Sequence, residues 1–519
     1  MEERSFRNAI QDKNVFTVTW ELVPGRGSWE ESQEKTLRLA EQAAKGKKVH
    51  AVSLTDNPGG NVAIQPEAIG KDIQKLGLDT IIHVTCKDRN RSQLESQLYA
   101  LERCGLHNIL ALTGDYDLGG ADGRAKPVFD LDSTQLLELI KKLNSGMEYQ
   151  TMKGKATLKS CHFFAGAAVS PFKATEAEQM LQYYKLKKKI EQGAQFIITQ
   201  VGFDARKFEE LILYVQKMGW QIPLIGDIYI LGYGAARVMN QNKVPGCVVT
   251  DKLLRELDEE RNSPDKGKEA MLKRAAKQYA VLKGLGYKGV HLGGMNINYE
   301  QIEYIISYGE ELSRNWQDYV REFDYPQKNG FYLFGRDSKT GLNNPALPPQ
   351  QYQTDSKVGL NYKVSRLLHK MFFEPGKKFF APMQALTCRI HGGTLEKGLH
   401  GMERLIKKIM YNCQDCGDCA LFDLAYICPM GECPKNQRNG PCAGSYQGFC
   451  EVYPGQKKCA WVRAYERLHK YGEQSCLGEY YISPCNWELK NTSSWVNYYL
   501  GKDHSAPRLG IKLKVKDKN

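Results

Sequence analysis

The chain has 519 residues, 42% hydrophobic and 25% charged, which is the composition of a folded protein with two or three domains rather than of a disordered one. The formal net charge of +13 is spread along the chain, and its two basic runs, at 185–189 and in the C-terminal tail, lack interleaved aromatic residues, so we expect no nucleic-acid binding. The first residues are polar and no apolar stretch approaches ~18 residues, so we expect no signal peptide, no membrane span and a cytoplasmic protein.

Eight short, β-branched apolar runs recur over the first three hundred residues, with amphipathic segments between them. The segments SQLESQLYALERCG and EAEQMLQYYKLKKKIEQGA place apolar residues three and four positions apart, which is typical of helices that pack on one face. Buried strands alternating with such helices predict a parallel sheet, and eight units of this length suit a closed (β/α)8 TIM barrel. An open, doubly wound sheet is the alternative. The expected strands are 15–22, 49–56, 80–86, 108–114, 163–169, 196–200, 222–228 and 289–294.

The barrel pattern ends near residue 310, so residues 1–310 are assigned to the barrel domain. Residues 311–372 include FGRDSKTGLNNPALPPQQYQTDSK, whose Pro, Asn and Gln content predicts an irregular linker or wrapping segment. A helical segment, LEKGLHGMERLIKKIMYN, then leads into a cysteine-rich region. We therefore expect a smaller, metal-binding second domain over residues 373–519, ending in a basic tail.

Eight cysteines crowd residues 413–459 of this second domain, whereas the first four hundred residues of the chain contain only five. In a reducing compartment such a cluster binds metal more often than it forms disulfides. The spacing opens with CxxCxxC and continues with two Cys-Pro pairs, and both a tetrahedral zinc ion and a 4Fe-4S cluster take four thiolates. The CxxCxxC cysteines with one downstream cysteine are expected to bind a first cluster, and eight ligands permit two. The candidate ligands are Cys413, Cys416, Cys419, Cys428, Cys433, Cys442, Cys450 and Cys459.

Polar residues at the carboxyl ends of the strands are the candidates for chemistry, because TIM-barrel active sites lie there. Taken singly, each has an ordinary explanation as a loop acid, a turn former or a strand cap. These residues are Glu21, Thr55, Asp56, Asn57, His83, Thr85, Asp115 and Gln200.

Four segments, TWELVPGRG, HVTCKDRN, ALTGD and LKKKIEQGAQFIITQVGFD, resemble in this order the landmarks of the flavin-dependent methylenetetrahydrofolate reductase family. The resemblance covers about residues 15–300. It implies a catalytic role for Glu21, Asp115 and Gln200. The flavin contacts that we expect are Thr55, His83, Thr85, Asp115 and Lys189, the last of them to a phosphate.

The chemistry of that family supports these roles. Opening the ring of 5,10-methylenetetrahydrofolate needs a proton at the departing nitrogen, and a partly desolvated carboxylic acid with a raised pKa can deliver it, so Glu21 is the expected general acid. The iminium ion then takes hydride from N5 of the flavin, with Asp115 favouring the cation and Gln200 holding the pterin edge. FAD is expected in preference to FMN. The family's usual acid at the flavin ribose is Gln182 in this chain.

The segment GECPKNQRNGPCAGSYQGFCEVYPGQKKCAWVRAY resembles the cysteine-rich domain that accompanies these reductases in anaerobes and acetogens. This resemblance implies that an iron–sulfur or NADH-dehydrogenase-type donor protein supplies electrons through a 4Fe-4S cluster to the flavin. The enzyme would then interconvert 5,10-methylenetetrahydrofolate and 5-methyltetrahydrofolate. One alternative is a folate-binding methyl-transfer partner with a structural zinc module and no flavin. Another is a C-terminal domain that serves for docking alone. A homo-oligomer is compatible with the sequence.

Overall fold

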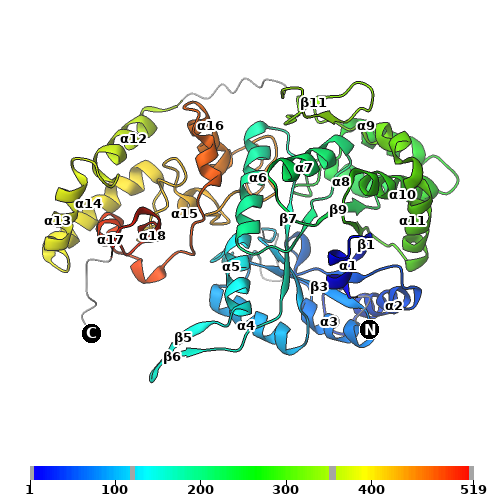
Figure 1. The fold of residues 1–519 in the computed structure, drawn as a ribbon, viewed down its shortest axis with the longest axis horizontal. Helices are drawn as coiled ribbons and strands as arrows, with labels where there is room; N and C mark the ends of the chain where they lie inside the picture. Colours follow the sequence, from blue (N-terminus) through cyan, green and yellow to red (C-terminus); the bar gives the residue numbers. More distant parts are fainter. Residues whose placement is uncertain (1–4, 117–122, 350–357, 513–519) are drawn as a thin grey trace.

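The computed structural model describes residues 5–116, 123–349 and 358–512 (Figure 1). Eight parallel strands close into a barrel in the order β1-β10-β9-β8-β7-β4-β3-β2. Each strand overlaps one of the eight expected runs, which confirms the TIM barrel. Their bounds are β1 Thr17–Leu22, β2 Ala51–Leu54, β3 Asp79–Thr85, β4 Asn108–Leu112, β7 Phe164–Val169, β8 Phe196–Thr199, β9 Leu224–Tyr229 and β10 Gly289–Gly293.

Helices surround this barrel, and their apolar faces form the main core against the outside of the sheet. The helices of the barrel region are α2 Glu31–Gly46, α3 Pro66–Lys75, α4 Arg91–Arg103, α5 Ser133–Asn144, α6 Glu176–Glu191, α7 Ala205–Lys217, α8 Tyr233–Asn240, α9 Asp251–Glu260, α10 Lys268–Leu285 and α11 Tyr299–Leu312. A hairpin of β5 (Glu148–Thr151) and β6 (Gly154–Thr157), which the sequence did not indicate, follows α5.

The amino-terminal end of the barrel is closed by α1 (Phe6–Gln11). Phe6 is fully buried and packs edge-on against Phe196 and Phe164, with ring centroids 5.1 and 6.0 Å away. Its backbone N–H also donates to Asp79 Oδ2 (2.8 Å). Because apolar side chains fill this end, a ligand site is left at the opposite end, where the strands finish.

Residues 311–372 are more regular than their composition indicated. They contain the 3-10 segment η3 (Ser313–Phe323), a short pairing of β11 (Gly335–Arg336) with β12 (Asn343–Asn344), and the helix α12 (Leu360–Phe372). The expectation of an irregular segment is wrong for α12, because its helical period was hidden behind the Pro- and Gln-rich stretch before it. The segment contacts the barrel region where Phe331 N–H donates to Ala174 O (2.9 Å), and its wrapping role stays a prediction.

The C-terminal region packs on the barrel through α6. Ala177 and Leu181 of α6 share an apolar cluster with Trp461 and Tyr465 of α16. The helices α12, α13 and α14 lie at the end of the long axis that is remote from the barrel (Figure 1). The remaining bounds are α13 Phe380–Ile390, α14 Thr394–Tyr411, α15 Pro429–Glu432, η4 Gln474–Gly478, η5 Trp487–Leu489, α16 Ala460–His469, α17 Ser494–Leu500 and α18 Ala506–Leu509.

The domain boundaries at 310 and 373 stay predictions.

Across the described ranges, no helix combines the length and the apolar character that crossing a membrane requires.

Candidate functional site

A cavity of about 290 Å³ opens at the carboxyl ends of the barrel strands. This volume is near the lower end of the roughly 300–1,000 Å³ that small-molecule sites occupy. The sequence-predicted residues that line the cavity are Glu21, Thr55, Asp56, His83, Thr85, Asp115, Lys189 and Gln200. Asn57, the remaining candidate, is not among the lining residues. Its side chain makes local bonds, accepting from Ala63 N–H (2.8 Å) and donating to Asp88 (2.9 Å).

Asp56 is a structural acid at this cavity. Its carboxylate accepts bonds from Thr85 N (3.0 Å) and Thr85 Oγ1 (2.8 Å) and forms a buried ion pair with Arg89. The hydroxyl proton of Thr85 is therefore used, which leaves Thr85 as an acceptor toward a ligand. The buried Oγ1 of Thr55, by contrast, has no hydrogen-bond partner among the described residues, so it is available to a ligand.

Two basic side chains line the cavity in environments that disfavour their charge. His83 Nε2 lies 2.5 Å from Ser53 Oγ, and burial lowers the pKa of His83 to about 4, so the ring is neutral at physiological pH. Burial and the nearby charge of Lys185 lower the pKa of Lys189 to about 7. Lys189 Nζ donates to Ala168 O (2.5 Å), and its phosphate contact stays a prediction.

Glu21 faces His291 across two neighbouring strands. Glu21 Oε2 and His291 Nε2 are 3.9 Å apart, while His291 Nδ1 lies 2.8 Å from Thr19 Oγ1. Burial alone would raise the pKa of Glu21, but the interaction with the nearby His291, together with the charge of His83, lowers it below its ordinary value. The raised pKa that we expected for Glu21 is therefore wrong. The pKa of His291 is raised, because its interaction with Glu21 and the charge of Asp227 outweigh burial.

The carboxyl with a raised pKa is Asp227 on β9. Burial raises the pKa of Asp227 to about 7, with a smaller increase from the charge of Glu21 and an opposing effect of His291. Sequence reasoning missed Asp227 and His291 because both lie inside the apolar runs IPLIGDI and GVHLGG. A charged residue inside a barrel strand was the available signal, since barrel interiors are filled mainly by branched apolar side chains.

The C-terminal region completes the cavity. Residues 435–445, the rim segment, cross the barrel mouth beside α6 and β4. The bonds that join the two parts include Lys173 Nζ to Ser445 O (2.7 Å), Lys185 Nζ to Pro441 O (3.1 Å), Gln182 Nε2 to Cys442 O (3.2 Å) and Lys435 Nζ to Gly114 O (2.7 Å). Gly440, at φ +134°, passes so close to Lys185 that a Cβ there would lie 2.8 Å from the lysine's own Cβ.

The eight candidate cysteines divide into two sets around two further cavities, in chain order. The outer cavity is lined by Cys413, Cys416, Cys419 and Cys428. The inner cavity is lined by Cys433, Cys442, Cys450 and Cys459. Four residues, Lys435, Pro441, Cys442 and Glu451, line both the inner cavity and the barrel cavity. The inner set of thiols thus lies directly behind the wall of the barrel cavity.

Family models match most of this architecture. The model described as methylenetetrahydrofolate reductase matches residues 5–308, and a second, described as methylene-tetrahydrofolate reductase C terminal, matches residues 393–488. The chain belongs to the methylenetetrahydrofolate reductase family. Membership rests on the barrel match, which covers more than half of the chain.

Curated relatives within the reductase family match over shorter stretches. A Caenorhabditis elegans protein named "Probable methylenetetrahydrofolate reductase (NADPH)" is 29% identical over 182 residues, 34% of this chain and 24% of that protein. The 5,10-methylenetetrahydrofolate reductase of Pectobacterium carotovorum is 27% identical over 195 residues, 37% of this chain and 57% of that protein. The chain therefore spans well under two thirds of the relatives that it matches.

One solved structure is similar to the barrel region. It is titled as an uncharacterized protein from Clostridium thermocellum that binds two copies of 5-methyl-5,6,7,8-tetrahydrofolic acid. The likeness has a TM-score of 0.41 at 12% identity and covers 60% of this chain and 99% of that one. A similarity of this size has no bearing on function.

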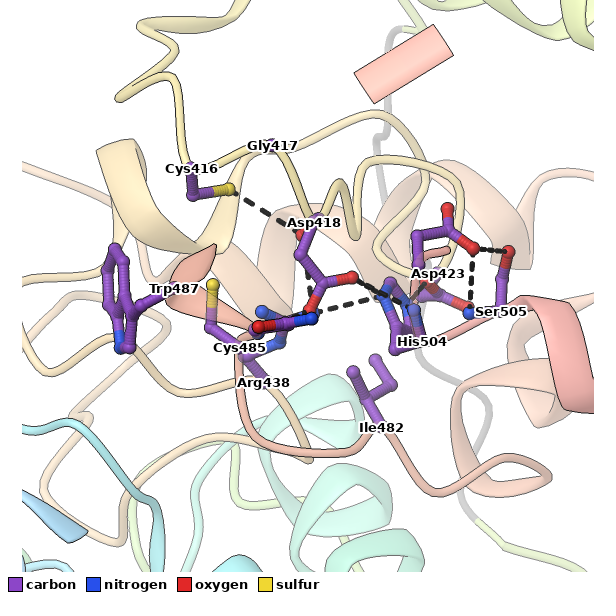
Figure 2. Close-up of polar contacts among 12 residues, drawn as sticks. Cys416, Gly417, Asp418, Asp423, Arg438, Ile482, Cys485, Trp487, His504 and Ser505 are labelled. Carbon is purple, nitrogen blue, oxygen red and sulfur yellow. Dashed lines mark hydrogen bonds and ion pairs between the residues drawn. The ribbon is translucent and has the colours of Figure 1, made fainter. Parts of the chain in front are cut away.

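A buried charge network beside Cys416 joins residues inside the reductase C-terminal match to His504, which lies beyond it (Figure 2). His504 bonds to Asp418 through Nδ1 (2.5 Å) and to Asp423 through Nε2 (3.0 Å), and Arg438 pairs with Asp418. Although burial alone would lower it, these two bonds raise the pKa of His504 to about 9. The network anchors the loop between the second and third cysteines of the CxxCxxC motif.

Proposed function

We propose that this member of the family interconverts 5,10-methylenetetrahydrofolate and 5-methyltetrahydrofolate, with a flavin in the barrel cavity and electrons supplied through the cysteine-rich domain. The observation that carries the proposal is the shared wall: Cys442 lines both the inner four-cysteine cavity and the cavity of Glu21. A relay into a barrel cofactor requires such an adjacency.

The barrel cavity offers a flavin ring suitable partners. Thr55 Oγ1 is a buried hydroxyl without a partner among the described residues, and the neutral ring of His83 lines the same cavity. A bound flavin would supply hydride transfer at N5. FAD, expected from the sequence, stays a prediction. The rim contacts favour the mononucleotide FMN instead, because the rim segment already bonds to Gln182 and Lys185 beside the cavity. A second nucleotide along this side of α6 would have to displace those bonds.

The folate proton is proposed to be held by the group of Glu21, His291 and Asp227 rather than by Glu21 alone. With its lowered pKa, Glu21 is ionised at neutral pH, whereas the raised pKa of His291 and the pKa of about 7 of Asp227 keep protons close to it. Glu21 would then pass to the folate nitrogen a proton that it receives from His291. This keeps Glu21 as the general acid while explaining its lowered pKa.

Two further side chains are held in place before any substrate binds. Asp115 Oδ2 accepts a bond from Gly59 N–H (2.9 Å), which fixes a carboxylate near the mouth. Gln200 Oε1 accepts from Val201 N–H (2.9 Å), so the amide NH₂ is the part of Gln200 that is free to donate to a pterin oxygen. Both roles agree with an ordered site for the folate ring.

Each four-cysteine cavity is proposed to hold one 4Fe-4S cluster. A single zinc ion needs its thiolates about 2.3 Å from one point. Across the described ranges, no three Cys, His, Asp or Glu side chains converge closely enough to hold one metal ion. Four thiols arranged around a cavity suit a larger, polynuclear group, in which each thiolate binds a different iron.

The test begins with protein purified without oxygen. We expect flavin together with iron and sulfide in the proportions of two 4Fe-4S clusters, and bleaching of the flavin when 5-methyltetrahydrofolate is added. Cys442→Ser should lose one cluster and slow the reduction of the flavin by dithionite-reduced viologen, while Cys388→Ser, at an exposed cysteine outside both sets, should behave as wild type. Protein that binds no flavin, or whose flavin does not respond to the folate, would refute the proposal.

A further inference from the structure

Helix α14 exposes large apolar side chains and buries an ion pair. Leu395, Leu405 and Ile409 are 72%, 62% and 78% exposed, whereas the buried residues of the helix are Glu403 and Lys407. With the exposed Met402 between them, these residues follow one another at steps of seven, three and four positions, which places them on one face of the helix. A helix of a free-standing protein normally has the opposite orientation, with its apolar face toward the core.

Helix α12 also exposes large apolar side chains and is joined to α14. Its buried residues are Tyr362 and Ser365, and the Ser365 hydroxyl lies 2.5 Å from the hydroxyl of Tyr411 at the end of α14. The exposed apolar residues of the three helices, here called the α12–α14 surface, are Leu360, Val364, Leu367, Leu368, Met371, Phe379, Leu386, Leu395, Met402, Leu405, Ile406, Ile409 and Met410. Because α13 contacts both α12 and α14, these exposed apolar side chains gather on neighbouring helices, and such gatherings mark interaction sites.

The charge of the same segment selects among possible partners. Residues 358–412 contain ten Lys and Arg but only three Glu and no Asp, a net charge of +7. Two copies of such a surface would repel each other, whereas an acidic protein would be attracted to it. The chain segments outside the described ranges, which read MEER, DLGGAD, QQYQTDSK and LKVKDKN, contain too few apolar residues to cover it.

The position of the surface indicates what the partner does. The buried side of α14 lines the outer cysteine cavity with Glu403, Arg404 and Lys407. Lys407 Nζ lies 3.6 Å from Cys419 Sγ and 2.7 Å from Glu403 Oε1. A protein docked on the opposite side of α14 would thus be separated from the outer cavity by about one helix diameter, ~10 Å. The surface also lies at the end of the molecule remote from the barrel (Figure 1).

We propose that the α12–α14 surface docks a small, acidic iron–sulfur protein that delivers electrons to the outer cysteine cavity. The inference rests on the proposed function, because it needs a redox cluster in that cavity. Cys413, Cys416, Cys419 and Cys428 would hold the accepting cluster, which would take up one electron for each electron that the partner's reduced cluster loses. No bond is made or broken, and the two events needed for one hydride follow by repetition.

The experiment uses the full chain and, as probe, a dithionite-reduced bacterial ferredoxin with a net negative charge. The rate of ferredoxin-dependent flavin reduction should fall as salt is added. Leu405→Asp and Ile409→Asp should each raise the KM for ferredoxin at least tenfold, and the double variant Lys397→Glu/Lys408→Glu should abolish the salt dependence. Met295→Asp, at a residue 72% exposed in the barrel region, is the matched control and should change neither.

The same proteins separate the failure modes. Iron content and viologen-driven flavin reduction should stay at wild-type values in every variant, which shows that the fold and clusters are intact. An unchanged KM for ferredoxin in the Leu405 and Ile409 variants would overturn the docking proposal. It would also be overturned if these variants abolished dimer formation, or binding to anionic lipid vesicles, without any effect on ferredoxin kinetics. If wild-type protein lacks viologen-driven flavin reduction as well, the proposed function itself has failed.

Discussion

The environment of Asp227 yields a stability prediction with a definite sign. Burial raises the pKa of this carboxyl from its ordinary value of 3.8 to about 7. The folded protein therefore holds this proton more tightly than the unfolded chain, so the group's contribution to the free energy of unfolding falls as pH rises between those two values and is constant above the higher one. One pKa unit is worth about 1.4 kcal/mol, so the group should cost the fold roughly 3 kcal/mol between about pH 5 and pH 8.

Asp227→Asn removes this titration while keeping the shape of the side chain. In urea unfolding at about pH 5 and pH 8, wild type should lose roughly 3 kcal/mol more than the variant over that interval, because only wild type loses the Asp227 proton. Folate turnover of wild type should also decline above about pH 7 as the Asp227 proton is lost, and the variant should lack this limb. Equal changes of unfolding free energy in the two proteins would show that Asp227 is ionised in the cavity.

Three other substitutions test separate parts of the architecture. Glu21→Gln should abolish folate-dependent flavin reduction while flavin stays bound, as absorbance measures; turnover near wild type would remove Glu21 from the mechanism. Cys413→Ser and Cys433→Ser should each lose half of the iron, and a loss of all iron in either would show that the two cysteine sets are not independent. Phe6→Ala should lower the free energy of unfolding by about 3–5 kcal/mol, since it empties the closed end of the barrel; denaturant titration showing under 1 kcal/mol would contradict that packing.

The barrel could be read from the sequence because each of its strands is a nearly continuous apolar run. Residues at strand ends were found for the same reason, since topology alone brings Glu21 and Gln200 to one mouth. Asp227 was missed because its strand was recognised by the apolar residues around it. The helix α12 was missed because composition was weighed over a window that mixed it with a Pro-rich stretch.

Long-range relations lay beyond sequence reasoning altogether. The spacing of the cysteines permitted many partitions, and the division into two sets of four depends on how the chain folds back after Cys428. The rim segment illustrates the same limit: Lys185 was part of a basic run that a solvated helix face would explain, yet its ammonium group donates to Gln437 Oε1 (2.8 Å) from the other end of the chain. No local pattern encodes a contact across 252 positions.

A single helix cap shows how tightly the two parts are joined. Asp132 is the N-cap of α5, and its Oδ1 accepts from Thr134 N–H (2.9 Å) and Gln135 N–H (3.0 Å), as a local capping motif does. Its Oδ2 accepts from Asn439 N–H (2.9 Å) and Asn439 Nδ2 (3.1 Å) of the rim segment. Withdrawing the rim segment would leave a buried carboxylate oxygen and buried amide groups without partners, at a cost of about 1–3 kcal/mol for each. The barrel mouth and the inner cysteine set are therefore held together by groups that the barrel helix itself requires, so the wall between them is a fixed part of the fold.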